Sequence, residues 1–125
     1  MTIKSLSSSQ IALIMKKGRA YSSGSFLLKT LPETVVLNEK NIESTFLCSF
    51  IASKKVFAKA VDRNRAKRRL KESFLEALRN IKEENLIGVP YQFVFLAKKE
   101  VLNNDFTNLF HDIKQILLKD YIIKQ

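Results

Sequence analysis

Nine basic side chains gather between positions 54 and 71, and they are the residues of this sequence best suited to bind phosphate. One acidic residue, Asp62, stands among them, so this basic stretch carries a net +8 of the chain's formal +10. An arginine guanidinium can bond two phosphate oxygens at once, a lysine adds a point charge, and each neutralised phosphate releases bound counterions. Charge focused in this way predicts a binding site for a polyanion. The nine are Lys54, Lys55, Lys59, Arg63, Arg65, Lys67, Arg68, Arg69 and Lys71.

Asn64 lies between two of these arginines, at the expected start of a helix, where its amide can fix the backbone or bond sugar and phosphate groups. Helical spacing predicts that several charged side chains share one face, while Ala66 and Leu70 turn toward the core. The charged side chains expected on that shared face are Arg65, Arg68, Arg69 and Glu72. A solvated basic helix face is the alternative interpretation, but nine cations against one acid favour a binding surface.

Side chains that could catalyse a reaction are scarce. Cys48 is the only cysteine and His111 the only histidine, so one chain can form neither a disulfide nor a zinc site of thiolates and imidazoles. We expect Cys48 to be a buried strand thiol and His111 to lie at a helix surface. Asp62, Glu72 and Glu76 are expected to pair with neighbouring cations. We therefore predict no catalytic and no metal-binding residue, although a protein-only nuclease, which would need clustered carboxylates or a histidine, is the competing enzyme interpretation.

Length and composition indicate one domain spanning residues 1–125, because the chain has 125 residues and a hydrophobic fraction of 46%. No stretch approaches the roughly 18 to 20 consecutive apolar residues that span a bilayer, and the N-terminus has no apolar signal-peptide core. We expect a cytoplasmic protein without a membrane partner. The positive charge makes nucleic acid the first partner to consider.

The hydrophobic pattern indicates the elements that must position the basic stretch. Ser7 to Gln10 fit a capping box that opens a short helix, and Gly18 is expected to close it. Strands are expected at residues 26–31, 34–37 and 45–53, and in the last of these, alternate side chains should face opposite sides of a sheet.

Beyond about Val61 the period changes to that of a long amphipathic helix. Gly88-Val89-Pro90 then breaks the chain, a strand is expected at 91–97, and a final helix with a strong apolar stripe follows a cap at 103–105. The predicted order is helix, two or three strands, helix, strand, helix. This order indicates an α+β fold, a single-domain α/β sandwich with helices packed on the sheet.

One string within and beyond the basic stretch is specific enough to suggest a family. It reads Ser53-Lys54-Lys55, then seven residues, then Arg63-Asn64-Arg65-Ala66-Lys67-Arg68-Arg69-Leu70-Lys71-Glu72-Ser73-Phe74. This string resembles the signature of the bacterial ribonuclease P protein component, and the chain length and element order agree with that family. The resemblance implies a subunit of a ribonucleoprotein endonuclease that removes the 5′ leader from precursor tRNA. It also implies that the catalytic centre and its Mg²⁺ ions belong mainly to the partner RNA.

The same resemblance assigns roles to particular residues. Arg63, Asn64, Arg65, Lys67 and Arg68 would contact ribonuclease P RNA. The sheet and the first helix would form a cleft for the single-stranded leader of precursor tRNA. The residues expected at that cleft are Ile11, Met15, Phe26 and Lys29. A left-handed crossover between parallel strands, containing the basic helix, is also implied and would be an exception to the usual handedness.

Several positions depart from the family pattern. Lys71 stands where arginine is usual, and Arg69 where an apolar residue is usual. Ile11, Met15 and Lys29 stand where aromatic residues are common, so base stacking worth roughly 1 to 3 kcal/mol per base should be partly lost there. Plain core packing is the alternative role for Ile11 and Met15.

A ribosomal or other structural RNA-binding protein is the competing interpretation from the binding class, and only the motif separates the two. A DNA partner is not expected. The basic helix is joined to core packing along its length, and the sequence has neither a dimer seam nor helix-turn-helix spacing.

Overall fold

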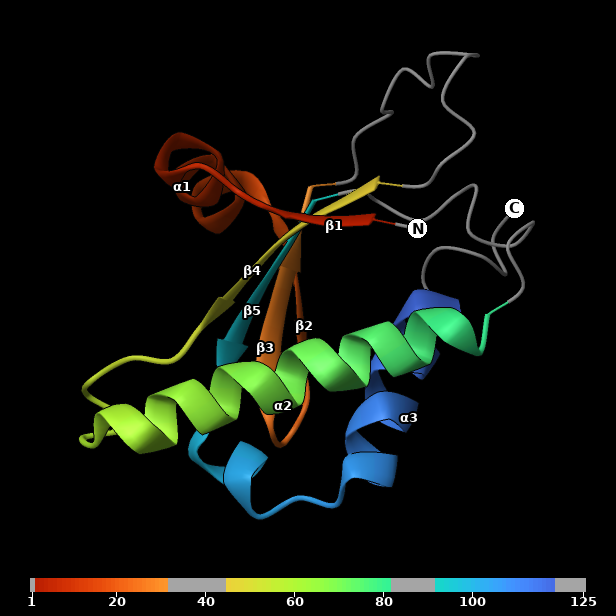
Figure 1. Cartoon of the computed structure of the whole chain (residues 1–125). Coiled ribbons are helices and arrows are strands. Elements are labelled where there is room, and N and C mark those ends of the chain that lie inside the picture. Colours follow the sequence, from red (N-terminus) through yellow and green to blue (C-terminus); the bar gives the residue numbers. More distant parts are fainter. Residues whose placement is uncertain (1, 32–44, 82–91, 119–125) are drawn as a thin grey trace.

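The computed structural model describes residues 2–31, 45–81 and 92–118 and shows one five-stranded sheet with helices on both faces (Figure 1). The strand order is β1-β4-β5-β3-β2. Strands β1, β4 and β5 are parallel, whereas β3 runs antiparallel to β5 and β2 antiparallel to β3. In chain order the elements are β1 (Thr2–Ser5), α1 (Ser8–Lys17), β2 (Arg19–Ser22), β3 (Phe26–Thr30), β4 (Thr45–Ile51), α2 (Ala60–Arg79), β5 (Gln92–Ala97), the 3-10 helix η2 (Lys99–Leu102) and α3 (Phe106–Leu117). The predicted α+β fold is confirmed.

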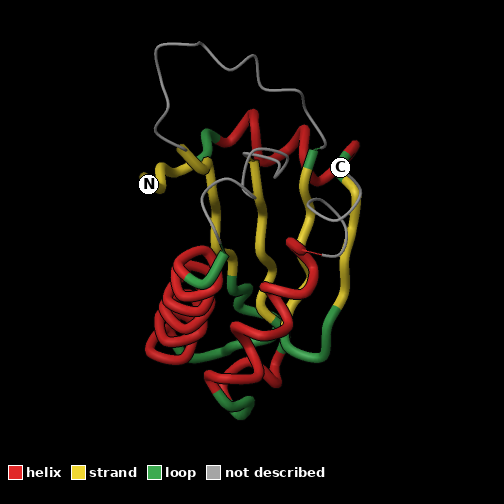
Figure 2. Tube along the Cα trace, turned by 90° about the vertical axis from the view of Figure 1, so that its right-hand side faces the viewer, coloured by secondary structure: helices red, strands yellow, loops and turns green. Residues whose placement is uncertain are grey.

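The sheet separates two apolar clusters. Helices α2 and α3 cover one face (Figure 2), and their buried side chains join those of β3, β4 and β5. Helix α1 covers part of the other face, over a smaller cluster of Leu6, Ile14, Leu31 and Val94. The predicted alternation of β4 is confirmed, because Phe46 and Cys48 lie in the first cluster while Leu47 packs against the second.

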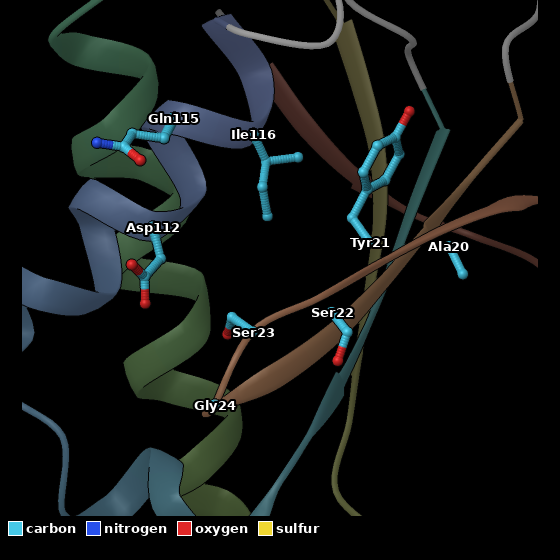
Figure 3. A pocket seen from close by; sticks show the side chains of 8 residues that line it. All are labelled: Ala20, Tyr21, Ser22, Ser23, Gly24, Asp112, Gln115 and Ile116. Carbon is cyan, nitrogen blue, oxygen red and sulfur yellow. The ribbon is translucent and has the colours of Figure 1, made fainter.

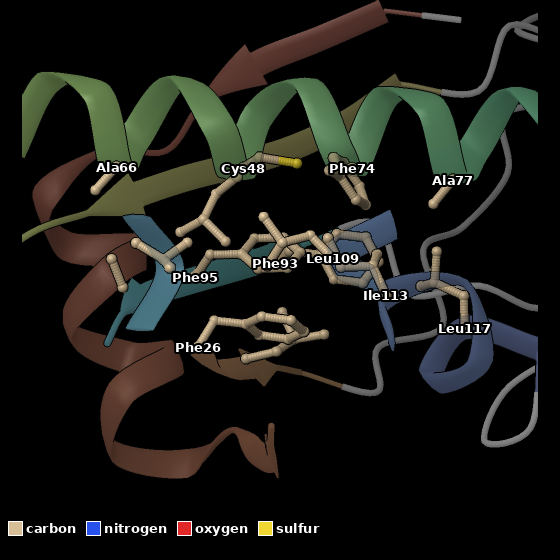
Figure 4. Close-up of a cluster of buried hydrophobic side chains, with 14 of the residues drawn as sticks. Phe26, Cys48, Ala66, Phe74, Ala77, Phe93, Phe95, Leu109, Ile113 and Leu117 are labelled. Atoms are coloured by element: carbon tan, nitrogen blue, oxygen red, sulfur yellow. The ribbon is translucent and has the colours of Figure 1, made fainter. Parts of the chain in front are cut away.

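Phenylalanine rings form the centre of the larger cluster (Figure 4). The Phe74 ring, from the middle of α2, has its centroid 5.3 Å from the centroids of both Phe93 and Phe95. Phe46 approaches Phe74 edge-on at 6.2 Å. Tilted and edge-on contacts of this kind suit the charge distribution of aromatic rings. Helix α2 is therefore fixed to the sheet by its buried side, and its opposite side faces solvent.

The predicted ends of α1 are confirmed. The Gln10 amide donates to Ser7 Oγ at 3.2 Å and the Ser7 amide donates to Gln10 Oε1 at 2.8 Å, which completes the capping box. At the other end the Gly18 amide donates to the Ile14 carbonyl. A Cβ atom on Gly18 would lie 2.3 Å from that carbonyl oxygen, so the tight turn that closes α1 requires glycine, and the Thr30 carbonyl oxygen of β3, at 3.2 Å, leaves little further room.

Two differences from the predicted elements stand out. Both sheet edges, β1 and β2, were not predicted, because strands of four residues give too short a pattern to recognise. Strand β4 ends at Ile51, two residues before the predicted end. The predicted strand at 34–37 and the first position of the strand predicted at 91–97 lie outside the described residues.

Helix α2 connects the adjacent parallel strands β4 and β5, as the resemblance implies. The handedness of this crossover stays a prediction. Among the residues that the structure describes, no helix combines the length and the apolar character needed to cross a bilayer.

Candidate nucleic-acid interface

The connection between β4 and α2 is an ordered turn that sets where the basic stretch begins. The Val56 amide donates to Ser53 Oγ at 3.2 Å, and the Phe57 amide donates to the Ser53 carbonyl at 2.9 Å. The Phe57 side chain is buried in the larger cluster. The Arg63 guanidinium donates to the carbonyls of Phe57 and Ala58 at 2.9 and 3.0 Å. Arg63 thus fastens the turn to the first turns of α2.

Seven of the nine cations of the basic stretch are exposed and make no ion pair or hydrogen bond through their side chains with any described residue. They are Lys54, Lys55, Lys59, Arg65, Lys67, Arg68 and Lys71. An ion pair at 3.4 Å joins Arg79 to Glu76 near the end of α2. The expected pairing of Glu76 is thereby confirmed, whereas Asp62 and Glu72 make no ion pair with a described cation. Unneutralised cations on α2 and on the turn before it leave a positive field that can attract a polyanion.

Four residues of α2 line one wall of a groove of about 480 Å³ beside the sheet. They recur at helix positions i, i+3, i+4 and i+7 and so share one face; they are Asn64, Lys67, Arg68 and Lys71. The opposite wall comes from the end of β1 and from β4, through Ser5, Cys48, Ser49 and Phe50. A groove with a cationic wall and a hydroxyl-bearing wall can hold phosphate and sugar groups together.

Arg69 does not belong to the face of α2 that lines the groove. The prediction that it shares one exposed face with Arg65 and Arg68 is wrong. Its Nε donates to the Val101 carbonyl at 3.0 Å, and a second guanidinium nitrogen donates to the Asn104 carbonyl. These bonds join α2 to the segment before α3. Arg69 lies about 100° around the helix from Arg68 and so borders the core, which explains the error. RNA contact by Arg63 and Arg69 stays a prediction.

Replacing Arg69 with methionine should therefore lower the free energy of unfolding by about 1 to 3 kcal/mol, because two partly buried carbonyls lose charged donors. Urea unfolding measures the change. The matched control is Arg65→Met, which removes the same group from an exposed position and should shift the free energy of unfolding by less than about 0.5 kcal/mol. Equal losses of stability in the two variants would contradict a structural role for Arg69.

The residues predicted to line a leader cleft lie on both sides of the sheet. Phe26 is fully buried in the larger cluster, with its ring centroid 5.7 Å from that of Phe95, so it cannot stack on a base and its assignment to the cleft is corrected. Strand alternation explains this, because Phe26 and Lys29 are an odd number of residues apart and face opposite sides. Ile11 and Met15 are half-buried against the smaller cluster on the α1 side. Lys29 Nζ donates to the Met15 carbonyl at 2.8 Å and closes the end of α1.

A second cavity, which the sequence did not indicate, lies between the β2–β3 hairpin and α3 (Figure 3). It has a volume of about 610 Å³ and lies apart from the basic stretch. Its lining combines the Tyr21 ring and serine hydroxyls of the hairpin with Asp112 and Gln115 of α3. No motif could have indicated it, because its walls come from segments about ninety positions apart.

The surroundings of Cys48 and His111, the two side chains considered for catalysis, are those of ordinary structural residues. Cys48 is buried as predicted, and burial raises the pKa of its thiol far above the usual value, so it stays protonated. The exposed His111 ring stacks on Phe110 at 4.4 Å. No three His, Cys, Asp or Glu side chains among the described residues gather in a way that could hold a metal ion.

Comparison with known proteins agrees with the fold and the motif. The family model described as Ribonuclease P matches residues 4–121. The chain is 35% identical to the ribonuclease P protein component of a Nitratiruptor species, over 83% of this chain and 79% of that one. It is 31% identical to the component from Clostridium kluyveri, over 89% of this chain and 88% of that one.

Two solved structures show the same fold. The RNase P protein of Staphylococcus aureus superposes with a TM-score of 0.60 at 20% identity, covering 95% of this chain and 93% of that one. The RNase P protein from Thermotoga maritima gives a TM-score of 0.61 at 20% identity, with coverages of 87% and 89%. Because the family model spans nearly the whole chain and the curated relatives match over most of their length, this chain belongs to the ribonuclease P protein family.

Proposed function

We propose that this chain is the protein subunit of ribonuclease P, which binds the catalytic RNA through the basic stretch and promotes removal of the 5′ leader from precursor tRNA. The observation that supports this most directly is the group of seven exposed cations without a described partner. Membership of the family makes an RNA of the ribonuclease P type the natural polyanion for them. We expect the protein to act in the cytoplasm.

In this proposal the RNA carries out the hydrolysis, with Mg²⁺ bound mainly by the RNA. Mg²⁺ prefers oxygen ligands such as carboxylates and phosphates, and the α2 face offers ammonium and guanidinium groups instead. Those groups suit the phosphates of the RNA. Each phosphate that a protein cation neutralises reduces the repulsion between phosphates that folded RNA must overcome. The protein therefore acts by binding and positioning, and no side chain of this chain takes part in the chemical step.

The 5′ leader would run along the α1 side of the sheet, where Ile11 and Met15 are half-buried and offer apolar contact. Lys29 uses one of its three donors on the Met15 carbonyl, which leaves two for a leader phosphate. Because no aromatic ring is among these residues, the leader would be held by apolar contact and charge, and stacking would contribute little.

The test is reconstitution of leader removal from precursor tRNA at low Mg²⁺. A bacterial ribonuclease P RNA alone should be nearly inactive under these conditions, and the protein should restore cleavage at the mature 5′ end because its cations replace missing Mg²⁺. The protein without RNA should not cleave. Cleavage by the protein alone would assign the chemistry to this chain, and RNA binding without stimulation would favour a structural RNA-binding protein.

A further inference from the structure

Two valines break the pattern of polar residues on the surface of the basic stretch. Among the described residues only three large hydrophobic side chains are exposed: Leu13 at 43%, Val56 at 42% and Val61 at 72%. The two valines lie five positions apart, on either side of the start of α2. Both therefore belong to the end of the molecule where β4 passes into α2, at the left of Figure 1.

The backbone holds both valines outward. The Val56 amide is bonded to Ser53 Oγ, and its neighbour Phe57 points into the core, so the turn cannot rotate to bury Val56 without breaking that bond and exposing the Phe57 ring. Val61 lies in the first turn of α2, and the carbonyl-bonded Arg63 ties that turn to residues 57 and 58. Exposed apolar groups held this way are preformed for a partner.

The residues near the valines are basic, which favours a negatively charged partner. Lys54, Lys55, Lys59 and Arg65 are exposed beside them in the chain and make no side-chain bond with a described residue. Two exposed valines with four free cations close to them in the chain are complementary to a ligand with a flat apolar surface between negative charges. An unpaired nucleotide in an RNA chain has this form, because its base presents a π-face and phosphates flank it.

We propose that Val56 and Val61 pack against an unpaired base of the RNA partner, while the neighbouring lysines hold the phosphates on either side of it. The inference rests on the proposed function, since the RNA is the ribonuclease P RNA. An unpaired base fits better than the minor groove of a duplex, because valines there would cover 2′-hydroxyl groups without offering them hydrogen bonds. The apolar contact of the valines would thus contribute affinity that does not depend on salt, whereas the contribution of the lysines does depend on it.

The test compares the binding of ribonuclease P RNA to the wild-type protein and to Val56→Ser/Val61→Ser across a salt series. The variant should raise the Kd about tenfold and leave the slope of log Kd against log salt unchanged, because no charge is removed. Dimethyl sulfate modification should show an adenine or cytosine in an unpaired segment that wild-type protein protects and the variant does not. Leu13→Ser, the matched exposed residue on α1, should leave Kd and the modification pattern as in the wild type.

Two further measurements separate the possible failures. Val61→Ala places the best helix former in the first turn of α2, so it cannot unfold the helix and should still raise Kd by about two- to fivefold. Wild-type protein that binds the RNA with a steep salt slope upholds the proposed function, and an unchanged Kd in both valine variants then overturns this inference alone. A lowered salt slope in the variants, or a wild-type dimer that the variants abolish, would also overturn it, the latter by assigning the valines to a protein contact.

Discussion

Replacing Arg65 and Arg68 together with alanine should weaken binding to ribonuclease P RNA by about a hundredfold, because each charged phosphate contact is worth on the order of tenfold. Both side chains are exposed on α2 without a described partner, so their removal leaves no buried group unsatisfied. The slope of log Kd against log salt should fall by about 0.7 to 0.9 for each phosphate that the variant no longer neutralises. Stimulation of leader removal at low Mg²⁺ should disappear in parallel.

The control for this variant is Lys99→Ala/Lys114→Ala, which removes the same charge from η2 and α3. If the protein attracted RNA only through its net charge, the two double variants would weaken binding equally. We expect the control to bind within about threefold of the wild type, since long-range attraction is screened beyond roughly 10 Å at 0.1 M salt. An unchanged salt slope in Arg65→Ala/Arg68→Ala would remove α2 from the RNA interface.

The interface was predictable from sequence where its signal is local. A helix places residues three and four apart on one face, so the spacing of Ala66 and Leu70 showed which side of α2 is buried, and both are fully buried. The basic stretch needs no tertiary contact to be recognised, because consecutive cations remain neighbours in any fold. The capping box at Ser7 is likewise contained in four residues.

Features that depend on contacts between distant segments were not predictable. Arg69 looks like its neighbours in sequence, and only the arrival of Val101 and Asn104 beside α2 gives its guanidinium acceptors. Phe26 was assigned to the leader cleft by resemblance, although the strand period alone places it opposite Lys29. The sheet edges β1 and β2 gain their strand character from pairing with β4 and β3.

Replacing Phe74 with alanine should have the largest effect on stability, because its ring is fully buried between the sheet and α2. A cost of about 3 to 5 kcal/mol is expected for such a change, which is a large share of the roughly 5 to 15 kcal/mol that stabilises a typical domain. Urea unfolding of the free protein measures it. The matched control is Phe106→Ala, which removes a partly exposed ring from α3. It should lower the free energy of unfolding by less than half as much.

The Phe74→Ala variant also separates stability from recognition. Its cations remain in place, so the folded fraction should bind RNA with the salt slope of the wild type, whereas Arg65→Ala/Arg68→Ala should show a lowered slope at wild-type stability. RNA at 100 times its Kd should return about 2.7 kcal/mol of stability to the protein, provided that it binds only the folded state. Leader removal by Phe74→Ala should therefore recover as RNA is added. A lowered salt slope in Phe74→Ala would instead mean that the buried face of α2 determines how its cations meet the RNA.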